Sequence, residues 1–232
     1  MRLQAADGSL KNGSGAFSEM VETSLERAAV SKDLASLTDS LKTRNLQLQD
    51  ARRQLAEQAT IDEMTGLRNR RGVNIIINDE LARMKRMQLP IAVIALDVDH
   101  FKTYNDNYGH LAGDQVLQQL ANVMLEMTSR AGEFAARMGG EEFVLFYPTV
   151  NRTAALELAE ELRMKVLGLK IPHEKSLTAE YVTVSIGVIS CVPEWELEFD
   201  TLLKAADDAL YLSKTSGRNR VTCGELEASD PS

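Results

Sequence analysis

The chain has 232 residues, a formal net charge of −8 and a sequence pI of about 5.0, and 44% of its residues are hydrophobic. This acidic balance argues against nucleic acid and anionic lipid as partners, and no apolar run approaches the ~20 residues of a membrane span. The two cysteines, Cys191 and Cys223, stand outside any metal or redox pattern, so we expect reduced thiols. We therefore expect a cytoplasmic protein without direct membrane insertion, or the cytoplasmic output region of a larger sensor protein.

The first 60 residues are predicted to lack a globular core. Residues 1–16 are rich in Gly, Ser and Ala, which indicates a flexible segment. Residues 17–60 contain no Pro or Gly and are predicted to form a helical stalk, whose leucines recur every seven residues at Leu34, Leu41, Leu48 and Leu55. The companion apolar position reads Val30, Leu37, Arg44, Ala51 and Gln58. This pattern predicts a coiled coil of about four heptads, with an amphipathic helix packed on its own domain as the alternative.

Residues 61–224 are predicted to form one globular domain, followed by a polar tail at 225–232. Helical spacing of apolar residues predicts helices over 69–87, 109–130, 151–167 and 199–214. Strands are predicted over 91–96, 181–189 and 220–223, with a hairpin over 134–148. The continuous apolar run 91–96 is typical of a central strand buried on both faces. The order of elements predicts an α+β fold, an antiparallel-containing sheet with a βαββαβ core flanked by helices.

Two carboxylates follow the glycine pair of the predicted hairpin turn. Glu141 and Glu142 are adjacent, and adjacent carboxylates repel each other unless a cation lies near them. Asp97 ends the apolar run 91–96, and if that strand lies beside the hairpin, Asp97 and Glu141 reach one point. Mg²⁺ takes one or two protein carboxylates and completes its shell with water, backbone oxygen and phosphate. A solvated loop charge is the alternative for each carboxylate taken alone.

Cations and polar side chains at other positions suit a nucleotide. Lys102 follows soon after Asp97, and Lys214 and Arg218 could meet an anion at the end of the last predicted helix. The alternative there is an ordinary helix C-terminus with Lys in its last turn and Gly as the cap. Asn105 and Asp114 could read a purine, because a carboxylate that accepts from guanine N1–H and N2 discriminates against adenine. Asp114 could equally be a solvated residue in the first turn of a helix.

Five sequence blocks together resemble the GGDEF domain family of diguanylate cyclases. They are DEMTGLRNR at 62–70, with Met64 where the family has Leu, DVDHFKTYNDNYGHLAGD at 97–114, GGEEF at 139–143, VSIGV at 184–188 and ADDALYLSKTSGRNR at 206–220. The resemblance runs from about residue 59 to residue 221, in the family's order and spacing. It implies the palm-like fold of nucleotidyl cyclases and the condensation of two GTP into cyclic di-GMP and two pyrophosphates. It also implies Mg²⁺ (or Mn²⁺) and a homodimer, since each domain binds one GTP.

The resemblance further implies a role for each matching residue. Asp97, Glu141 and the backbone carbonyl of Val98 would bind metal, and Asn105 and Asp114 would read guanine with His110 nearby. The backbone N–H of Phe101 and the side chain of Lys102 would face the phosphates, with Lys102 counted among the catalytic residues. Lys214 and Arg218 would hold the β- and γ-phosphates, and Glu142 would help to activate the ribose 3′-hydroxyl. Which of Glu141 and Glu142 acts as the base is left open, as is minor use of ATP.

One family motif departs from its usual form. The product-inhibition site usually reads R-x-x-D, and here Arg130 and Glu133 occupy its charged positions. Glu adds a methylene, and bidentate recognition depends on geometry, so we expect weakened inhibition by cyclic di-GMP. The alternative is that both residues are ordinary surface charges.

The sequence therefore leaves three alternative functions open. The first is an active diguanylate cyclase whose leucine heptads hold two copies together. The second is a catalytically silent GGDEF module that binds GTP or cyclic di-GMP and signals through its helix. The third is a structural coiled-coil dimer with an inert domain, which leaves Asp97, Asn105, Asp114, Lys214 and Arg218 unexplained.

Overall fold

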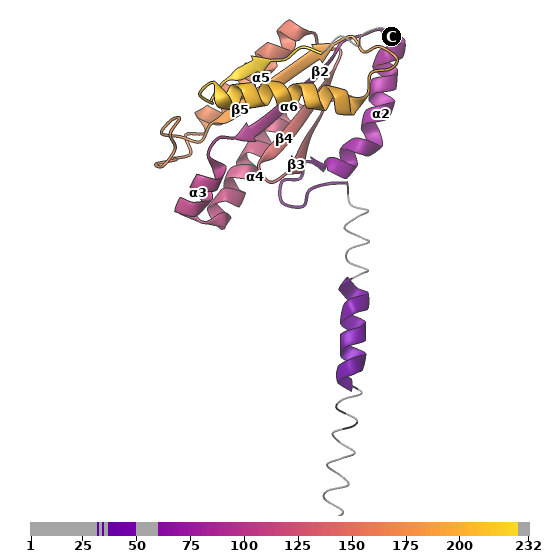
Figure 1. Ribbon diagram of the computed structural model, residues 1–232, viewed down its shortest axis with the longest axis vertical. Coiled ribbons are helices and arrows are strands. Elements are labelled where there is room, and N and C mark those ends of the chain that lie inside the picture. Colours follow the sequence, from indigo (N-terminus) through magenta and orange to yellow (C-terminus); the bar gives the residue numbers. More distant parts are fainter. Residues whose placement is uncertain (1–31, 33, 35–36, 50–59, 227–232) are drawn as a thin grey trace, which may run out of the picture. The chain divides into compact units, whose positions relative to one another are not determined.

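The computed structural model divides into two compact units, Met1–Gln58 and Ala59–Ser232, and describes residues 32, 34, 37–49 and 60–226. In the first unit residues 37–49 are helical, as predicted for the stalk (Figure 1). Leu34, Leu41 and Leu48 of the heptad are 62%, 56% and 61% exposed. The predicted flexible segment 1–16, the fourth heptad leucine Leu55 and most of the tail 225–232 lie outside the described residues. The coiled coil stays a prediction.

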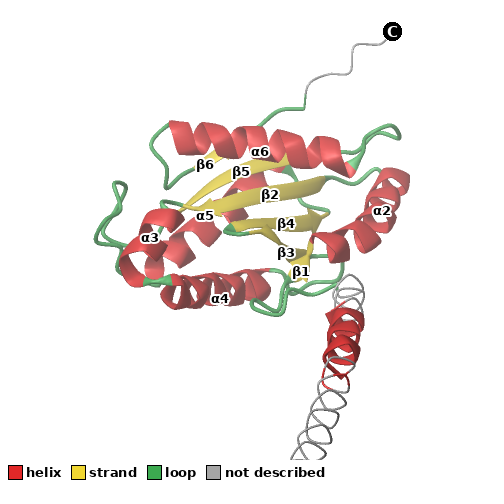
Figure 2. Ribbon diagram, turned by 60° about the horizontal axis from the view of Figure 1, so that its bottom comes forward, coloured by secondary structure: helices red, strands yellow, loops and turns green. Residues whose placement is uncertain are grey.

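The second unit is built on one mixed sheet, which confirms the predicted α+β class (Figures 1 and 2). From edge to edge its strands are β1 (Arg68–Asn69), β3 (Phe134–Gly139), β4 (Glu142–Pro148), β2 (Ile91–Val98), β5 (Val184–Cys191) and β6 (Val221–Cys223). β2 is antiparallel to both β4 and β5, and the edge strands β1 and β6 run parallel to their neighbours. The predicted hairpin is β3–β4.

Helices cover both faces of this sheet (Figure 2). Every residue of β2 is buried, as its continuous apolar run predicts. Ala92, Ile94 and Leu96 pack into a core with α3 (Phe101–Tyr108), α4 (His110–Met127) and α5 (Arg152–Gly168). Ile91, Val93 and Ala95 pack into a second core with α2 (Arg70–Met87) and α6 (Phe199–Thr215). Among the described residues, no helix combines the length and apolar character needed to cross a membrane.

Two element predictions need correction, and two elements were not predicted. The strand predicted over 181–189 begins only at Val184 and continues to Cys191, because Tyr181 makes an isolated bridge to Pro172 instead of joining the sheet. α3 and the two-residue strand β1 were not predicted, since neither has an apolar periodicity of its own. The helix predicted to reach residue 130 ends at Met127, where the Thr128 N–H and hydroxyl both donate to the Met124 carbonyl.

Candidate active site

The predicted metal carboxylates meet where β2 ends beside the signature hairpin. The register of the two strands pairs Asp97 with Glu142, and Glu141 precedes it in the turn. Gly140 has φ +53°, a left-handed value that favours glycine, and so the tight turn needs it there. Asp97 is 8% exposed. Burial raises the pKa of Asp97 to about 6, Lys214 opposes that rise, and the negative charges of Glu141 and Glu142 add to it.

Lys214 reaches this corner from the last turn of α6. Its Nζ lies 2.8 Å from Asp97 Oδ2, so the ion pair joins a predicted phosphate ligand to a predicted metal ligand. Three carboxylates against one ammonium leave a surplus of negative charge, and their oxygens are the donors that Mg²⁺ prefers. Within residues 60–226 no three His, Cys, Asp or Glu side chains form a metal cluster. The donor set therefore fits an ion that takes one or two carboxylates and completes its shell from substrate and water.

The end of α6 forms the predicted helix cap. The Arg218 N–H donates to the Ser213 carbonyl at 3.0 Å and Gly217 has φ +111°, the arrangement of a Schellman motif. The helix packs tightly on β5, since a Cβ at Gly187 would lie 2.0 Å from the Ala206 carbonyl oxygen. The cap and the predicted phosphate role are compatible, because the cap uses backbone atoms and leaves the Lys214 and Arg218 side chains to meet an anion.

The predicted base-reading residues lie at the junction of α3 and α4. Asn105 Oδ1 is buried and has no hydrogen-bond partner within the described part of the chain. A Cβ at Gly113 would lie 1.9 Å from that oxygen, so the amide of Asn105 faces α4 next to Asp114, which is exposed. An unpaired buried acceptor costs free energy unless a ligand donates to it.

The remaining predicted site residues of this block lie at the end of β2 and at the starts of α3 and α4. Val98 and Phe101 are buried at 2% and 8% exposure, so they can offer only backbone atoms to a ligand. Lys102 and His110 are exposed in the first turns of α3 and α4.

Arg137 fastens the signature turn to the first sequence block of the domain. Its Nε donates to the Gly140 carbonyl at 2.8 Å, and its Nη1 lies 3.2 Å from Asp62 Oδ1. Asp62 Oδ1 also accepts the Thr65 hydroxyl at 2.6 Å. The glutamates of the turn are thus presented from a backbone that a charge-assisted hydrogen bond holds in place.

The degenerate inhibition motif folds back on itself. Glu133 Oε2 accepts the backbone N–H of Arg130 at 3.0 Å, and the Glu133 N–H donates to the Arg130 carbonyl at 3.1 Å. A hollow of about 290 Å³ beside Glu133 is lined also by Arg68, Asp79 and Glu80. The Glu133 carboxylate is therefore already hydrogen-bonded within its own turn.

Two carboxylates near the site escaped prediction. Desolvation raises the pKa of Asp207, the negative charges of Glu142 and Asp208 add to the rise, and Arg70 and Lys214 oppose it, although Asp207 as a whole is exposed. The sequence feature that could have identified Asp207 is its position in the block at 206–220. The second is Asp99, 1% exposed and hydrogen-bonded to Thr183, Ser185 and Asn219. Its position two residues after Asp97 made it noticeable in the sequence but did not indicate a role.

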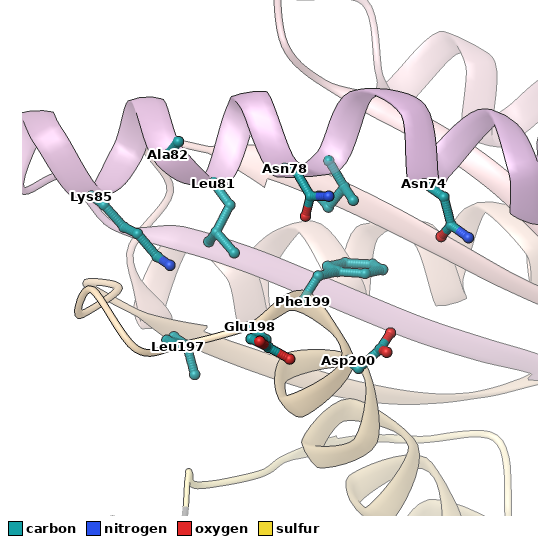
Figure 3. Close-up of a pocket in the computed structure, with 10 residues that line it drawn as sticks. Asn74, Asn78, Leu81, Ala82, Lys85, Leu197, Glu198, Phe199 and Asp200 are labelled. Atoms are coloured by element: carbon teal, nitrogen blue, oxygen red, sulfur yellow. The ribbon is translucent and has the colours of Figure 1, made fainter.

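A further hollow of about 580 Å³ lies between α2 and the start of α6, where Asn78 and Leu81 approach Phe199 (Figure 3). Lys85 Nζ, from the same stretch of α2, donates to the Trp195 carbonyl at 2.8 Å. None of the predicted site residues lines this hollow.

Comparison with known proteins decides the family. The family model for the diguanylate cyclase GGDEF domain matches residues 59–220. The chain belongs to this family. It is 38% identical over 167 residues to the response regulator PleD of Caulobacter vibrioides, a match that covers 71% of the chain and 36% of PleD. It is 32% identical over 161 residues to the diguanylate cyclase DosC of Escherichia coli, covering 69% of the chain and 34% of DosC. The chain thus matches about a third of the length of these curated relatives.

A solved structure of similar fold includes a coiled coil. The coiled coil and GGDEF domain of DgcB from Caulobacter crescentus, in complex with c-di-GMP, superposes with a TM-score of 0.65 at 32% identity. The match covers 82% of this chain and 98% of the DgcB chain. The resemblance stated from the five sequence blocks is thereby confirmed at the level of family and fold.

Proposed function

We propose that this GGDEF-family chain is an active diguanylate cyclase that condenses two GTP into cyclic di-GMP and two pyrophosphates. The observation that carries the proposal is the 2.8 Å contact of Lys214 Nζ with Asp97 Oδ2 beside an unbroken Gly-Gly-Glu-Glu turn. Residues suited to metal and residues suited to phosphate lie together there although about 120 positions separate them in the sequence. The complex of DgcB with c-di-GMP supports the same nucleotide chemistry. The reaction assigns the domain to the cytoplasm, where GTP is available.

We propose that Asp97, Glu141 and the backbone carbonyl of Val98 hold Mg²⁺ or Mn²⁺. When bound, the ion neutralises and orients the triphosphate. Asp97 and Lys214 pair with each other, and in the proposed site Asp97 would hold the metal while Lys214 would hold phosphate. The ion pair keeps both side chains ordered at the positions where they are later needed.

The nucleotide is positioned by residues on three elements. Asn105 and Asp114 read the guanine edge, and the buried unpartnered Asn105 Oδ1 supports that role, with His110 close in the sequence. The Phe101 N–H and Lys102 meet the phosphates from the start of α3. Lys214 and Arg218 hold the β- and γ-phosphates. Such positioning and charge neutralisation supply most of the catalysis in phosphoryl transfer.

The chemical step forms one bond and breaks one. The ribose 3′-oxygen of one GTP bonds to the α-phosphorus of the other, and the bond from that phosphorus to the bridging oxygen breaks. Pyrophosphate leaves with the bonding electrons, and the hydroxyl proton passes to a carboxylate of the signature, Glu142 or Glu141. The step occurs twice to close the ring. Because each domain offers one nucleotide site, the two GTP must come from two copies of the chain.

We further propose that the stalk delivers the second copy. In a single chain Leu34, Leu41 and Leu48 are more than half exposed, and a parallel partner helix would bury them. The polar breaks at Arg44 and Gln58 in the companion position weaken this seam without removing the leucine repeat.

The deciding experiment measures product formation from GTP and Mg²⁺ against protein concentration, beside GTP binding. An active dimeric cyclase gives a specific activity that rises with concentration and then saturates. Glu142→Ala should bind GTP and make no product, and activity near the wild-type value would remove its assigned role. GTP binding without turnover would favour the silent signalling module. The absence of both GTP binding and turnover would favour the structural protein.

The stalk is tested separately with two matched substitutions. Leu41→Glu places a charge in the heptad seam, whereas Gln49→Glu adds the same charge at an exposed position about two turns further along. We expect only Leu41→Glu to lower specific activity at low protein concentration, with recovery at high concentration. Equal behaviour of the two variants would contradict a dimer through the stalk.

A further inference from the structure

Asp99 is a buried carboxylate that the proposed mechanism does not use. It follows Asp97 by two residues and is 1% exposed. Its Oδ1 accepts the Ser185 hydroxyl at 2.6 Å, and its Oδ2 accepts the Thr183 hydroxyl at 2.7 Å. Oδ2 also accepts the backbone N–H of Asn219 at 3.0 Å, from a residue 120 positions away. Both oxygens are thus engaged by protein donors, and Asp99 is not available as a ligand in the way that Asp97 is.

The segment that Asp99 holds has an unfavourable backbone conformation. Arg218 and Asn219 are consecutive non-glycine residues with φ of +64° and +45°. Left-handed conformations are unfavourable for non-glycine residues and persist where surrounding contacts fix them. The Arg163 Nη1–Asn219 Oδ1 hydrogen bond of 2.6 Å and the Asn219–Asp99 contact are such contacts.

The anchored segment carries the guanidinium proposed to bind phosphate. Arg218 directly precedes Asn219, whose backbone N–H is held by Asp99 Oδ2. The backbone also ties this turn down from its other side, since the Asp99 N–H donates to the Thr183 carbonyl at 2.9 Å. One buried carboxylate therefore joins the end of β2, the start of β5 and the segment after α6.

We propose that Asp99 is a positioning residue that fixes the Arg218 segment to the strand end bearing Asp97 and Val98. It sets the distance between the phosphate cation and the metal carboxylate without touching substrate. This inference rests on the proposed GTP condensation and adds to it the reason why Arg218 is preorganised. The expected signature is a loss of triphosphate affinity that depends on Arg218.

The test compares steady-state kinetics of the full chain with GTP and Mg²⁺. Asp99→Asn keeps the shape of the side chain but removes its charge and one acceptor; the hydroxyls of Thr183 and Ser185 can rotate, whereas the Asn219 N–H cannot. We expect KM for GTP to rise about tenfold with kcat changed less than about threefold, as for loss of one charge-assisted hydrogen bond. Asp200→Asn, an exposed carboxylate on α6, is the matched control and should leave both constants unchanged.

A double-mutant cycle separates positioning from general loss of structure. If Asp99 acts through Arg218, Asp99→Asn should add little to the KM of Arg218→Ala. The proposal would be overturned if the two substitutions multiplied each other's effects on KM in the double variant. An unchanged KM in Asp99→Asn alone would also overturn it. If Asp99→Asn does not fold, Ser185→Ala removes only the donor to Oδ1, and we expect about a threefold rise in KM that again disappears in the Arg218→Ala background.

Amide hydrogen exchange tests the same contact without any activity. The Asn219 N–H should be protected in the wild-type chain and exchange at least about tenfold faster in Asp99→Asn, while the Val188 amide in β5 keeps its rate. Exchange of wild-type Asn219 at the rate of an exposed loop would overturn the anchoring role. If the wild-type chain makes no product from GTP but Asn219 shows this protection, the proposed function fails and the anchor stands.

Discussion

Lys214 Nζ lies 2.8 Å from Asp97 Oδ2 and closes a contact between the last turn of α6 and the end of the central strand β2. The carboxylate is nearly buried, with a side chain 12% exposed, whereas the lysine side chain is 32% exposed. A buried charge that loses its partner is destabilising, and a partly exposed partner is screened by water. The pair is therefore sensitive to substitution, to pH and to divalent metal.

Lys214→Met should impair both the metal-free chain and the reaction. It leaves Asp97 without a cation, so we expect its pKa to rise further and the free energy of unfolding to fall by about 1 kcal/mol at neutral pH. Turnover of GTP should fall at least about tenfold, because a hydrogen bond from a charged group is worth roughly 1.5–3 kcal/mol. Chemical denaturation and a pyrophosphate-release assay measure the two effects. Lys204→Met, exposed on the same helix, is the control, and a Lys214→Met enzyme with wild-type turnover would contradict the assignment.

Divalent metal should bind less tightly below about pH 6. Burial raises the pKa of Asp97 from 3.8 to about 6, and a protonated carboxyl is a poor metal ligand. Mg²⁺ or Mn²⁺ affinity should therefore fall up to about tenfold per pH unit below that value. The stability of the metal-free chain depends on pH in the opposite direction. The folded state keeps the proton on Asp97 up to a higher pH than the unfolded state does, so the stability contributed by protonated Asp97 is lost as pH rises from 3.8 to about 6. Calorimetric metal titrations from pH 5 to 8 measure the trend, and a flat affinity would contradict the assignment of Asp97.

Gly113→Ala should weaken GTP binding while sparing the fold. A methyl group there would lie 1.9 Å from Asn105 Oδ1 and 2.9 Å from its Cγ, so the Asn105 amide must turn away. We expect GTP affinity to fall about tenfold, the cost of a misplaced hydrogen bond to the base. Gly168→Ala is matched, since its Cβ would meet nothing within 4 Å. Equal GTP affinities for the two variants would mean that Asn105 does not read the base.

Cyclic di-GMP should bind the Arg130–Glu133 motif weakly. Glu133 Oε2 already accepts the Arg130 N–H, and its extra methylene shifts the carboxylate from the usual position. Glu133→Asp should tighten binding about tenfold by restoring bidentate geometry, and Arg130→Ala should abolish that gain. Isothermal titration calorimetry measures the affinities. Tight binding by the wild-type chain that disappears with Arg130→Ala would show that the glutamate is tolerated.

Sequence patterns predicted those helices and strands that carry a local signal of their own. The run from Ile91 to Leu96 is apolar at every position, and β2 proved buried at every position. Asn151 begins α5 by accepting the Ala154 N–H, a local cap of a kind that sequence can indicate. The start of β5 was misplaced because Val182 donates to the Ile171 carbonyl outside the regular ladder, a pairing that no local pattern encodes.

The parts that were missed depend on distant contacts. α3 is polar and owes its stability to packing, with the Tyr104 ring 4.7 Å from Tyr108 and 5.2 Å from His173. The sequence pointed to Asp97 as the metal carboxylate, but it gave no sign that Asp99 differs from Asp97 in having protein donors at both oxygens. That difference arises from donors on β5 and after α6, more than 80 residues further along the chain.

The segment after α6 also has a consequence for biosynthesis. Residues 214–219 follow every strand except β6, yet they contact the end of β2, which is made first among the long strands. Domains fold as units while the chain emerges from the ribosome. A nascent chain that stops before residue 214 has the signature glutamates and the residues proposed to read guanine, but it lacks Lys214 and Arg218, the two cations proposed to hold the β- and γ-phosphates.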